Sequence, residues 1–501
     1  VKYDSLNPKP YLTLSSIYEN NNEPGKGIPY LKKLIRLYPE NKDAHLYLGL
    51  LYYRTSQMDS AYIEYQKAIY LMDKTEKDDF IYNSVKVLLE PYLKNKLNNL
   101  DESLLKQVIN LFWKERDPLN LTPYNERLLE HYTRVAYSNL RFSVPELNVI
   151  GWKTDRGTVV IRYGIPPHVI RIRDKTFSFV DISRNGEYIY GVPGESQYWD
   201  DTQQFAKDLL VTQPEEYHPK FEGPVFSVPN AAYQLKDFKK DNLTDLFISY
   251  GIKPSGKTEG NKESEYAHTS GIFLFDSYFR EIAENKNKIK SLSNMNKIEI
   301  PDSGSLFINT EKLVSPPDSG NLAFEIIRDK DKGVSSYHGK FKLKSFNSFS
   351  LEMSDIVLAS VVNKDKKIAG RINRMDYSIL PNPTGIFSED QDLYIYYEVY
   401  NLEKNERGLT DFQQTIILQK KGEEGFSIGK LAGSVLKFIG MEGNEQQIGL
   451  TSKYQTNDKN SSIYLQLDMK GYDPGNYVLS VKIKDNINCK EIKQNTNLIW
   501  K

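Results

Sequence analysis

The chain has 501 residues, 39% of them hydrophobic and 26% charged, which is the composition of a globular protein too long for one ordinary core. Its 66 basic and 66 acidic residues cancel, and this balance argues against nucleic acid or an anionic membrane surface as the main partner. Because Cys489 is the only cysteine, the sequence excludes an intrachain disulfide and a multi-cysteine metal site. It also contains no apolar run long enough for a transmembrane segment.

The first 100 residues show a helical repeat. Small and large side chains follow the spacing of a tetratricopeptide repeat at Leu48, Gly49, Tyr52, Ala61, Tyr65 and Ala68. The pattern recurs about 34 residues earlier, at Ser15, Tyr18, Gly27, Leu31 and Leu34. Residues 77–98 have helical spacing that fits a third unit or a cap. Such an array either binds peptides on a concave face or is a plain set of helical hairpins.

Helices are also predicted beyond residue 100. Asp101 or Ser103 is available to cap one helix start, and residues 125–137 form a second helical segment. The apolar positions of that segment lie on one stripe, at Leu128, Leu129, Tyr132, Val135 and Ala136. The stripe predicts an amphipathic helix.

From residue 150 the pattern changes to short strands. Residues 158–163 are β-branched and aromatic, and they predict the first strand. Later runs of the same kind lie at 246–250, 271–275, 322–327, 338–343, 393–400, 414–418, 462–467 and 477–483. Helical patterns are scarce after residue 285, so we expect antiparallel sandwiches rather than a parallel sheet.

The end of the chain has the pattern of an immunoglobulin-like module. A turn at residues 473–476 leads into Tyr477, after which apolar residues alternate as far as Ile483. In such modules the tyrosine ring packs inward and its hydroxyl bonds back to the backbone. Residues 235–345 look like a second module of this kind, and we expect residues 351–359 to link the two.

Three consecutive motifs resemble one protein family. Residues 112–118 read FWKERDP, residues 151–157 read GWKTDRG, and residues 158–166 read TVVIRYGIP. In this order they resemble GWxTD domain proteins, although His168 stands where that family tends to have an acidic residue. The resemblance implies a bacterial, Bacteroidota-like envelope or secreted protein in which helical repeats often precede the domain. It implies no known activity.

Physical chemistry favours a structural role for the motif at residues 151–157. Gly151 and Gly157 permit positive φ and therefore tight turns, and Trp152 can cover an adjoining sheet. The side chains of Thr154 and Asp155 can hydrogen-bond nearby backbone amides. We predict a structural clasp between the helical segment and the first strand, made by Gly151, Trp152, Thr154, Asp155, Arg156 and Gly157.

Two roles are open for Arg156. In the clasp, its guanidinium forms a forked pair with a carboxylate of the preceding motif, Glu115 or Asp117. In a catalytic pocket, Asp155 would be a general base, and Arg156 or Arg162 would bind an anion. No histidine, serine or cysteine partner lies at a diagnostic spacing, which favours the clasp.

Other candidate sites in the sequence are weak. The six histidines are scattered without metal-ligand spacing, so surface or capping roles are expected for His45, His131, His168, His218, His268 and His338. No phosphate loop, dinucleotide fingerprint or nucleophile elbow occurs, and no cofactor or metal is expected. A row of exposed rings at Tyr188, Tyr190, Tyr198 and Trp199 would suit a carbohydrate.

These observations predict a multidomain α + β chain. Its parts would be helical repeats at 1–100, a GWxTD region of helices and short strands at 101–230, and antiparallel β-sandwich modules at 231–350 and 351–501. The expected function is that of a non-enzymatic, extracytoplasmic scaffold or assembly protein. It would act through contacts with other proteins or with copies of itself, in a homo-oligomer or a filament. The alternatives are a carbohydrate-binding module and a hydrolase centred on the GWxTD motif.

Overall fold

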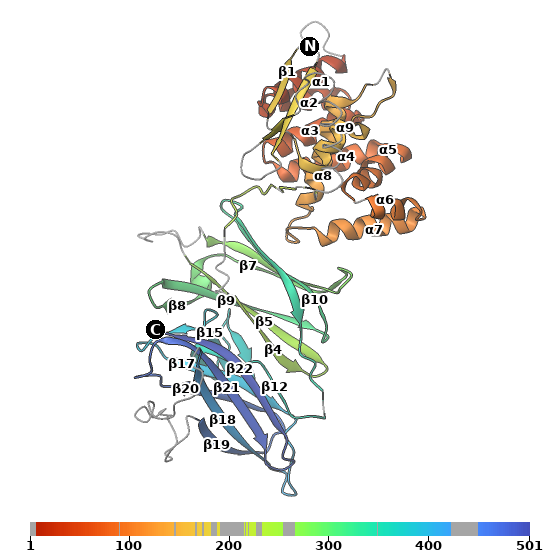
Figure 1. Cartoon of the computed structure of the whole chain (residues 1–501). Helices are drawn as coiled ribbons and strands as arrows, with labels where there is room; N and C mark the ends of the chain where they lie inside the picture. Colours follow the sequence, from red (N-terminus) through yellow and green to blue (C-terminus); the bar gives the residue numbers. More distant parts are fainter. Residues whose placement is uncertain are drawn as a thin grey trace. The chain divides into compact units, whose positions relative to one another are not determined.

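The computed structural model describes residues 7–89, 91–144, 147–165, 168–172, 175–181, 188–190, 215, 217–218, 220–226, 233–253, 266–347, 349–421 and 449–501, with only the backbone at 91, 155, 168–190, 449 and 450. The chain forms two compact units, Val1–Pro224 and Val225–Lys501. Helices predominate in the first unit and strands in the second (Figure 1). The predicted order of a helical region followed by several antiparallel sheets is therefore confirmed.

The helical unit begins with two helical hairpins. Their helices are α1 (Pro8–Asn20), α2 (Pro24–Leu37), α3 (Lys42–Arg54) and α4 (Met58–Leu71). Small residues bring the paired helices together: a Cβ at Gly49 would lie 2.8 Å from the ring of Tyr65. In the first hairpin the Ser15 hydroxyl donates to the carbonyl of Gly27 at 3.3 Å. The pattern of small residues thus determines which helix faces meet.

The rest of the helical unit packs on these hairpins. Its helices are α5 (Lys74–Asp78), η1 (Asp79–Asn83), η2 (Ser84–Leu88), α6 (Pro91–Asn98), α7 (Glu102–Glu115), α8 (Glu126–Phe142), η4 (Gly151–Lys153) and α9 (Asp155–Tyr163). Asp101 caps α7 by accepting from the amide of Leu104 at 2.9 Å, and Asn125 caps α8 in the same way. One hydrophobic core extends from Tyr11 in α1 to Ile161 in α9.

Residues 158–163 lie in helix α9, so the strand predicted there is wrong. The side chain of Thr154 caps the helix by accepting from the amide of Gly157 at 3.1 Å. Val160 and Ile161 are buried in the helical core. This burial outweighs a β propensity that amounts to only about 1 kcal/mol. Strands begin later, in a small antiparallel sheet of β1 (His168–Ile172), β2 (Lys175–Asp181) and β3 (Tyr188–Tyr190).

The described strands of the second unit form four sheets. The first has the order β11-β10-β6-β7 and the second β4-β5-β9-β8. Their strands are β4 (Tyr233–Lys240), β5 (Leu243–Ile252), β6 (His268–Phe275), β7 (Glu281–Ile289), β8 (Asn296–Ile300), β9 (Gly304–Ser315), β10 (Ser319–Arg328) and β11 (Val334–Lys342).

The third sheet has the order β12-β17-β13-β15-β14, with β20 also paired to β17, and the fourth has the order β16-β22-β21-β18-β19. Their strands are β12 (Glu352–Met353), β13 (Val357–Lys364), β14 (Ile372–Arg374), β15 (Tyr377–Pro381), β16 (Ile386–Phe387), β17 (Leu393–Tyr400), β18 (Thr410–Lys420), β19 (Gly449–Thr456), β20 (Ser461–Leu467), β21 (Gly475–Asp485) and β22 (Glu491–Trp500).

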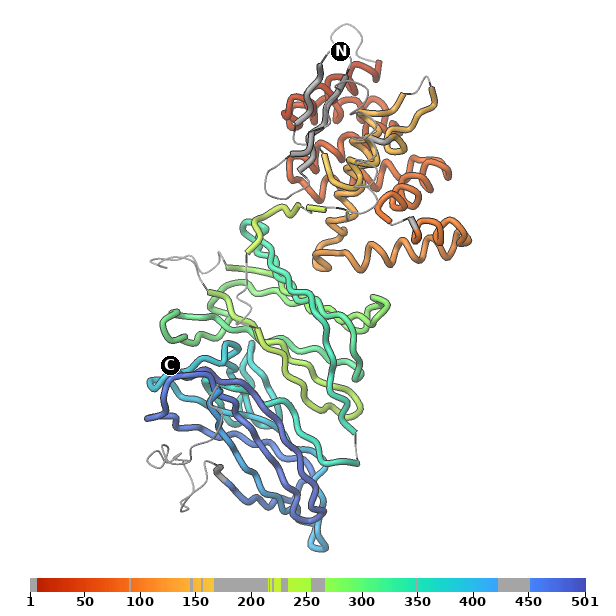
Figure 2. The backbone as a smooth tube through the Cα atoms, in the orientation of Figure 1, coloured from red at the N-terminus to blue at the C-terminus, as the bar shows by residue number. Residues whose placement is uncertain are grey.

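The four sheets pack face to face in succession, because the two middle sheets are buried on both faces. In β5, Ile248 belongs to the core shared with the first sheet, whereas Phe247 belongs to the core shared with the third. In β17, Tyr396 lies in that same middle core and Ile395 in the core shared with the fourth sheet. In Figure 2 the strands of the first two sheets are green to teal, and those of the last two are cyan to blue. The two predicted modules therefore pack on each other as one body.

Residues 351–359 are not a linker, contrary to expectation. They contain β12 and the start of β13, and Met353 and Ile356 are buried in the core between the third and fourth sheets. The turn before β21 does behave as expected. The hydroxyl of Tyr477 donates to the carbonyl of Asp473 at 2.6 Å, which fixes the turn to the strand that follows it.

A buried ion pair lies between the second and third sheets. Arg374 donates to both carboxylate oxygens of Glu398, at 2.9 and 2.6 Å, and to Asp245 of β5 at 2.7 Å. The hydroxyls of Tyr396 and Tyr400 donate to the same Glu398 carboxylate. Glu398 is fully buried, so these bonds replace the water that its charge has lost.

Removing Arg374 should destabilise the second unit strongly. In Arg374→Ala the buried carboxylates of Glu398 and Asp245 lose their shared cation, and we expect the free energy of unfolding to fall by about 3–5 kcal/mol. Urea denaturation of the full chain measures this. Lys297→Ala is the control, because it breaks an exposed pair with Glu299 and should cost less than about 1 kcal/mol. Equal losses in the two variants would contradict the role given to Arg374.

Candidate functional site

The motif at residues 151–157 is a helix start packed against α8. After η4, the hydroxyl of Thr154 donates to the carbonyl of Gly151 at 2.7 Å and accepts from the amide of Gly157. The amide of Trp152 donates to the side-chain oxygen of Asn139 on α8 at 3.1 Å. The side chain of Asp155 lies outside the described atoms. Thr154 thus makes the predicted kind of backbone hydrogen bond.

The two glycines of the motif are needed for close backbone contact. A Cβ at Gly151 would lie 2.1 Å from the carbonyl oxygen of Ser138, and one at Gly157 would lie 2.2 Å from the carbonyl oxygen of Gly151. Neither glycine has a positive φ, so the turn conformation predicted for them is wrong. Trp152 is buried in the helical core rather than over a sheet. The clasp therefore joins α8 to α9.

Arg156 takes a different place from the one predicted. Its guanidinium lies over the ring of Phe142, 5.0 Å from the centroid. Glu115, one of its predicted partners, pairs instead with Arg116 at 2.9 Å. Arg162, the other candidate for anion binding, is buried and donates to the carbonyl of Val87 at 2.8 Å. Neither arginine is therefore placed as the anion-binding residue that the catalytic alternative requires.

Helix α9 positions a buried arginine of α8. Arg134 donates to the carbonyl of Ile161 at 2.9 Å and to the carboxylate of Glu130 at 2.5 Å. Gly164 follows α9 with φ of +93°, and a Cβ there would lie 3.3 Å from the guanidinium of Arg134. The motif sets the start of α9, and the end of α9 sets the position of Arg134.

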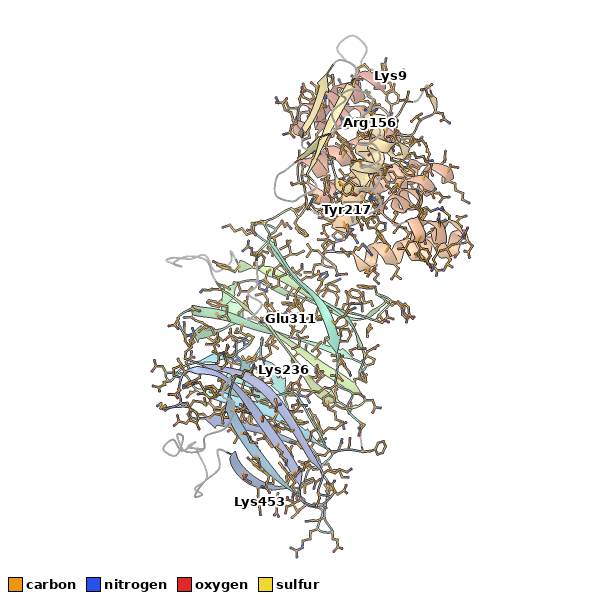
Figure 3. The ribbon with its side chains drawn as sticks, viewed as in Figure 1. Lys9, Arg156, Tyr217, Lys236, Glu311 and Lys453 are labelled. Carbon is orange, nitrogen blue, oxygen red and sulfur yellow. The ribbon has the colours of Figure 1, made fainter. Side chains whose placement is uncertain are left out.

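The ring of Tyr217, which is labelled in Figure 3, lies among the side chains of Trp113, Arg127, His131 and Arg134, which together with Glu130 we call the pocket. The guanidinium of Arg134 lies 4.0 Å from the centroid of the tyrosine ring and that of Arg127 lies 4.5 Å from it. The hydroxyl of Tyr217 is 2.9 Å from Nδ1 of His131, and the indole of Trp113 meets the ring edge-on. A phenol ring held by two cations and a hydrogen bond is a specific recognition geometry.

Residues around Tyr217 also bind the helices. Arg127 donates to Glu215 at 3.0 Å, and the amide of His218 donates to Glu130 at 3.3 Å. Further along, Lys220 lies over the ring of Tyr53, and the carboxylate of Glu222 accepts from the amide of Asp59 at 3.5 Å. We call Glu215, Tyr217, His218, Lys220 and Glu222 the docking segment.

The pocket contains a buried serine and histidine pair. The Ser84 hydroxyl donates to the carbonyl of Phe80 at 2.7 Å, and it lies 2.7 Å from Nε2 of His131. The proton therefore resides on Nε2, which donates to Ser84, and Nδ1 accepts from Tyr217. Both side chains are fully buried. A serine that is inaccessible and already donates to a carbonyl is not a nucleophile, so the pair is structural.

The predicted surface position holds for His218 and His338, which are exposed, but not for three other histidines. The side chain of His168 lies outside the described atoms. His45, His131 and His268 are buried. His45 bonds to Glu64 at 2.5 Å and to the carbonyl of Pro39 at 2.8 Å, and the bond to Glu64 raises its pKa. No cluster of three potential metal ligands occurs in the described part of the chain. The aromatic residues predicted to suit a carbohydrate have side chains outside the described atoms, at Tyr188, Tyr190, Tyr198 and Trp199.

Comparison with known proteins supports one assignment. The GWxTD domain model matches residues 49–203, so the chain contains a GWxTD domain that includes α8, α9 and the pocket-lining side chains. No curated protein matches the chain. Among the described residues, no helix has the length and apolar character to cross a bilayer.

Two solved structures show remote similarity. The B domain of a biofilm associated protein is 7% identical, with a TM-score of 0.17, and the match covers 56% of this chain and 89% of that one. The BSP domain of a biofilm associated protein is 8% identical, with a TM-score of 0.17, and the match covers 57% and 62% of the two chains. At this similarity neither match bears on fold or function.

A methyl group on either motif glycine should disrupt a backbone contact, between η4 and α8 at Gly151 and between α9 and η4 at Gly157. Gly151→Ala and Gly157→Ala place a carbon against rigid backbone, and we expect each to lower the free energy of unfolding by at least about 3 kcal/mol. Gly25→Ala is the matched control, because the nearest atom to its Cβ is 4.0 Å away. It should be neutral or stabilising by about 0.5–1 kcal/mol. Thermal denaturation of the three variants and the wild type measures these changes. If Gly151→Ala and Gly157→Ala were as stable as Gly25→Ala, the explanation by close backbone contact would be refuted.

The stability of the helical unit should depend on pH through His131. Burial, together with the charges of Arg134 and Arg127, lowers the pKa of His131 to about 3. The unfolded chain binds a proton there below about pH 6.5, and the folded chain does not. Above about pH 6.5, His131 is neutral in both states and does not lower the free energy of unfolding. As the pH drops from there toward 3, that free energy falls by about 1.4 kcal/mol per pH unit.

His131→Gln tests this dependence, because an amide can still bond to Ser84 and Tyr217. Urea denaturation of variant and wild type at about pH 7 and about pH 5 should give a smaller pH dependence in the variant. His338→Gln changes a more exposed histidine and serves as the control. An unchanged pH dependence in His131→Gln would show that His131 is not the titrating group.

Proposed function

We propose that this protein is a non-enzymatic scaffold or assembly subunit that acts through protein–protein contacts outside the cytoplasm. The observation that carries the proposal is an uncharged edge strand, β20, on a stack of packed sheets. The family resemblance favours a bacterial envelope or secreted location. The inaccessibility of Ser84 and His131 favours a contact function over nucleophilic chemistry at this pair.

The helical hairpins support identification as tetratricopeptide repeats. Gly49 of α3 packs against Tyr65 of α4, and Ser15 of α1 bonds to the backbone of Gly27 in α2. Gly49 and Ser15 are equivalent small positions, because they stand 34 residues (49 − 15) apart in the sequence. Arrays of such repeats typically present extended surfaces to other proteins.

The tyrosine turn supports an immunoglobulin-like identity for the last module. The bond from Tyr477 to the carbonyl of Asp473 is the kind of contact that fixes such modules at the start of a strand. Sandwich modules function commonly through their loops and edges. The carbohydrate-binding alternative depends on rings that lie outside the described side chains.

Strand β20 is the most open edge for pairing with another chain. Among the described strands it pairs only with β17, and its sequence, SSIYLQL, has no charge. Other edge strands carry lysines that oppose edge-to-edge pairing, at Lys286 and Lys288 in β7, Lys340 and Lys342 in β11, and Lys453 in β19. Two copies that pair through β20 would form a symmetric dimer.

A lysine placed on β20 should prevent this association. Tyr464 is 42% exposed, and Tyr464→Lys puts a charge on the edge without entering a core. We expect wild type to self-associate with concentration in sedimentation velocity and Tyr464→Lys to stay monomeric. Tyr278→Lys is the control, since it makes the same exchange in an exposed turn. A wild type that is monomeric throughout, or a variant that still associates, would count against the β20 contact.

A further inference from the structure

The docking segment is bound to the helical unit as a peptide ligand would be. Its described residues have no regular secondary structure. Its contacts include a ring stacked on guanidinium groups, an ion pair and a backbone hydrogen bond, made by Tyr217, Glu215 and the amide of His218. Recognition of an extended chain through alternate side chains and a backbone group is a recurring mode of peptide binding.

The charges of the pocket complement this segment. Arg127 and Arg134 line the pocket with two positive charges, of which Glu130 neutralises one, and His131 is neutral there. The remaining positive charge is matched by Glu215, two positions before the tyrosine. The charge of the pocket therefore complements an acidic residue at that spacing.

The pocket also has hydrogen-bonding capacity that the docking segment does not use. Nε1 of Trp113, Nε of Arg127 and Oε2 of Glu130 are buried and have no hydrogen-bond partner among the described residues. Two are donors and one is an acceptor. Buried polar groups are normally bonded, so these three atoms point to a ligand that contacts the pocket more completely than the chain's own segment does.

We propose that the pocket on α8 is a peptide-recognition site. It binds an extended segment of a partner protein in which an acidic residue stands two positions before a tyrosine. The chain's own docking segment occupies the site until such a segment competes with it. This goes beyond the scaffold role, and it does not depend on association through β20.

The test is binding of a labelled peptide to the full chain. The peptide copies residues 212–223, and Tyr217→Ala frees the site in the protein. In the wild type the docking segment competes with the peptide as part of the same chain, at an effective concentration on the order of mM. We therefore expect fluorescence polarisation to show at least about tenfold tighter binding to Tyr217→Ala than to wild type. Glu215→Lys, which repels Arg127, is a second way to weaken the internal segment while keeping its tyrosine.

Specificity is checked in the peptide and in the pocket. Replacing the peptide tyrosine by phenylalanine removes the bond to His131 and should weaken binding by about 2–10-fold. Adding Arg127→Glu to Tyr217→Ala should abolish binding. Circular dichroism must show that every variant is folded.

Two results would overturn the proposal. One is a lack of peptide binding by both folded variants, Tyr217→Ala and Glu215→Lys. The other is self-association of wild type that Tyr217→Ala abolishes and Tyr464→Lys does not, because the occupant would then be the docking segment of a second copy. Failure of the β20 contact alone leaves the peptide result unaffected, so the two proposals are tested separately.

Discussion

The helical unit depends on the neutralisation of one buried charge. Arg134 is only 2% exposed, so its guanidinium must find partners inside the protein. Glu130 supplies a negative charge, Ile161 a carbonyl and Tyr217 a ring face. These groups come from α8, α9 and the docking segment. A single desolvated cation thus requires three separate parts of the chain to meet, and the recognition pocket is a consequence of that requirement.

The motif residues have their effect through this arrangement. Gly151 lets η4 lie directly against α8, and Gly157 lets α9 lie against η4. Together they bring the last turn of α9 to Arg134. The second unit follows the same principle, since Arg374 and Glu398 are buried between two sheets and pair there. Losing one partner of such a pair is costly, because the other charge is left buried and unpaired. Arg374 of the third sheet also bonds to Asp245 of the second, so its bonds join the two sheets.

Several local features were predictable from the sequence. The cap at Asp101, the close approach at Gly49 and the tyrosine turn at Tyr477 each depend on residues near in sequence. The strand predicted at residues 158–163 and the carboxylate partner predicted for Arg156 were wrong. Both depended on what packs against the segment, and propensity carries no information about that.

The sequence by itself determined the order of helices and sheets, their caps and turns, and the motif that marks the GWxTD domain, because these follow from periodicity and short-range bonding. The tertiary structure alone decided the pocket. Arg127, Glu130, His131 and Arg134 recur on α8 at intervals of three and four residues, a pattern that also fits an ordinary solvent-facing stripe. Whether a polar stripe faces water or a half-buried tyrosine depends on chain segments far away in the sequence, and only the folded packing brings those segments together.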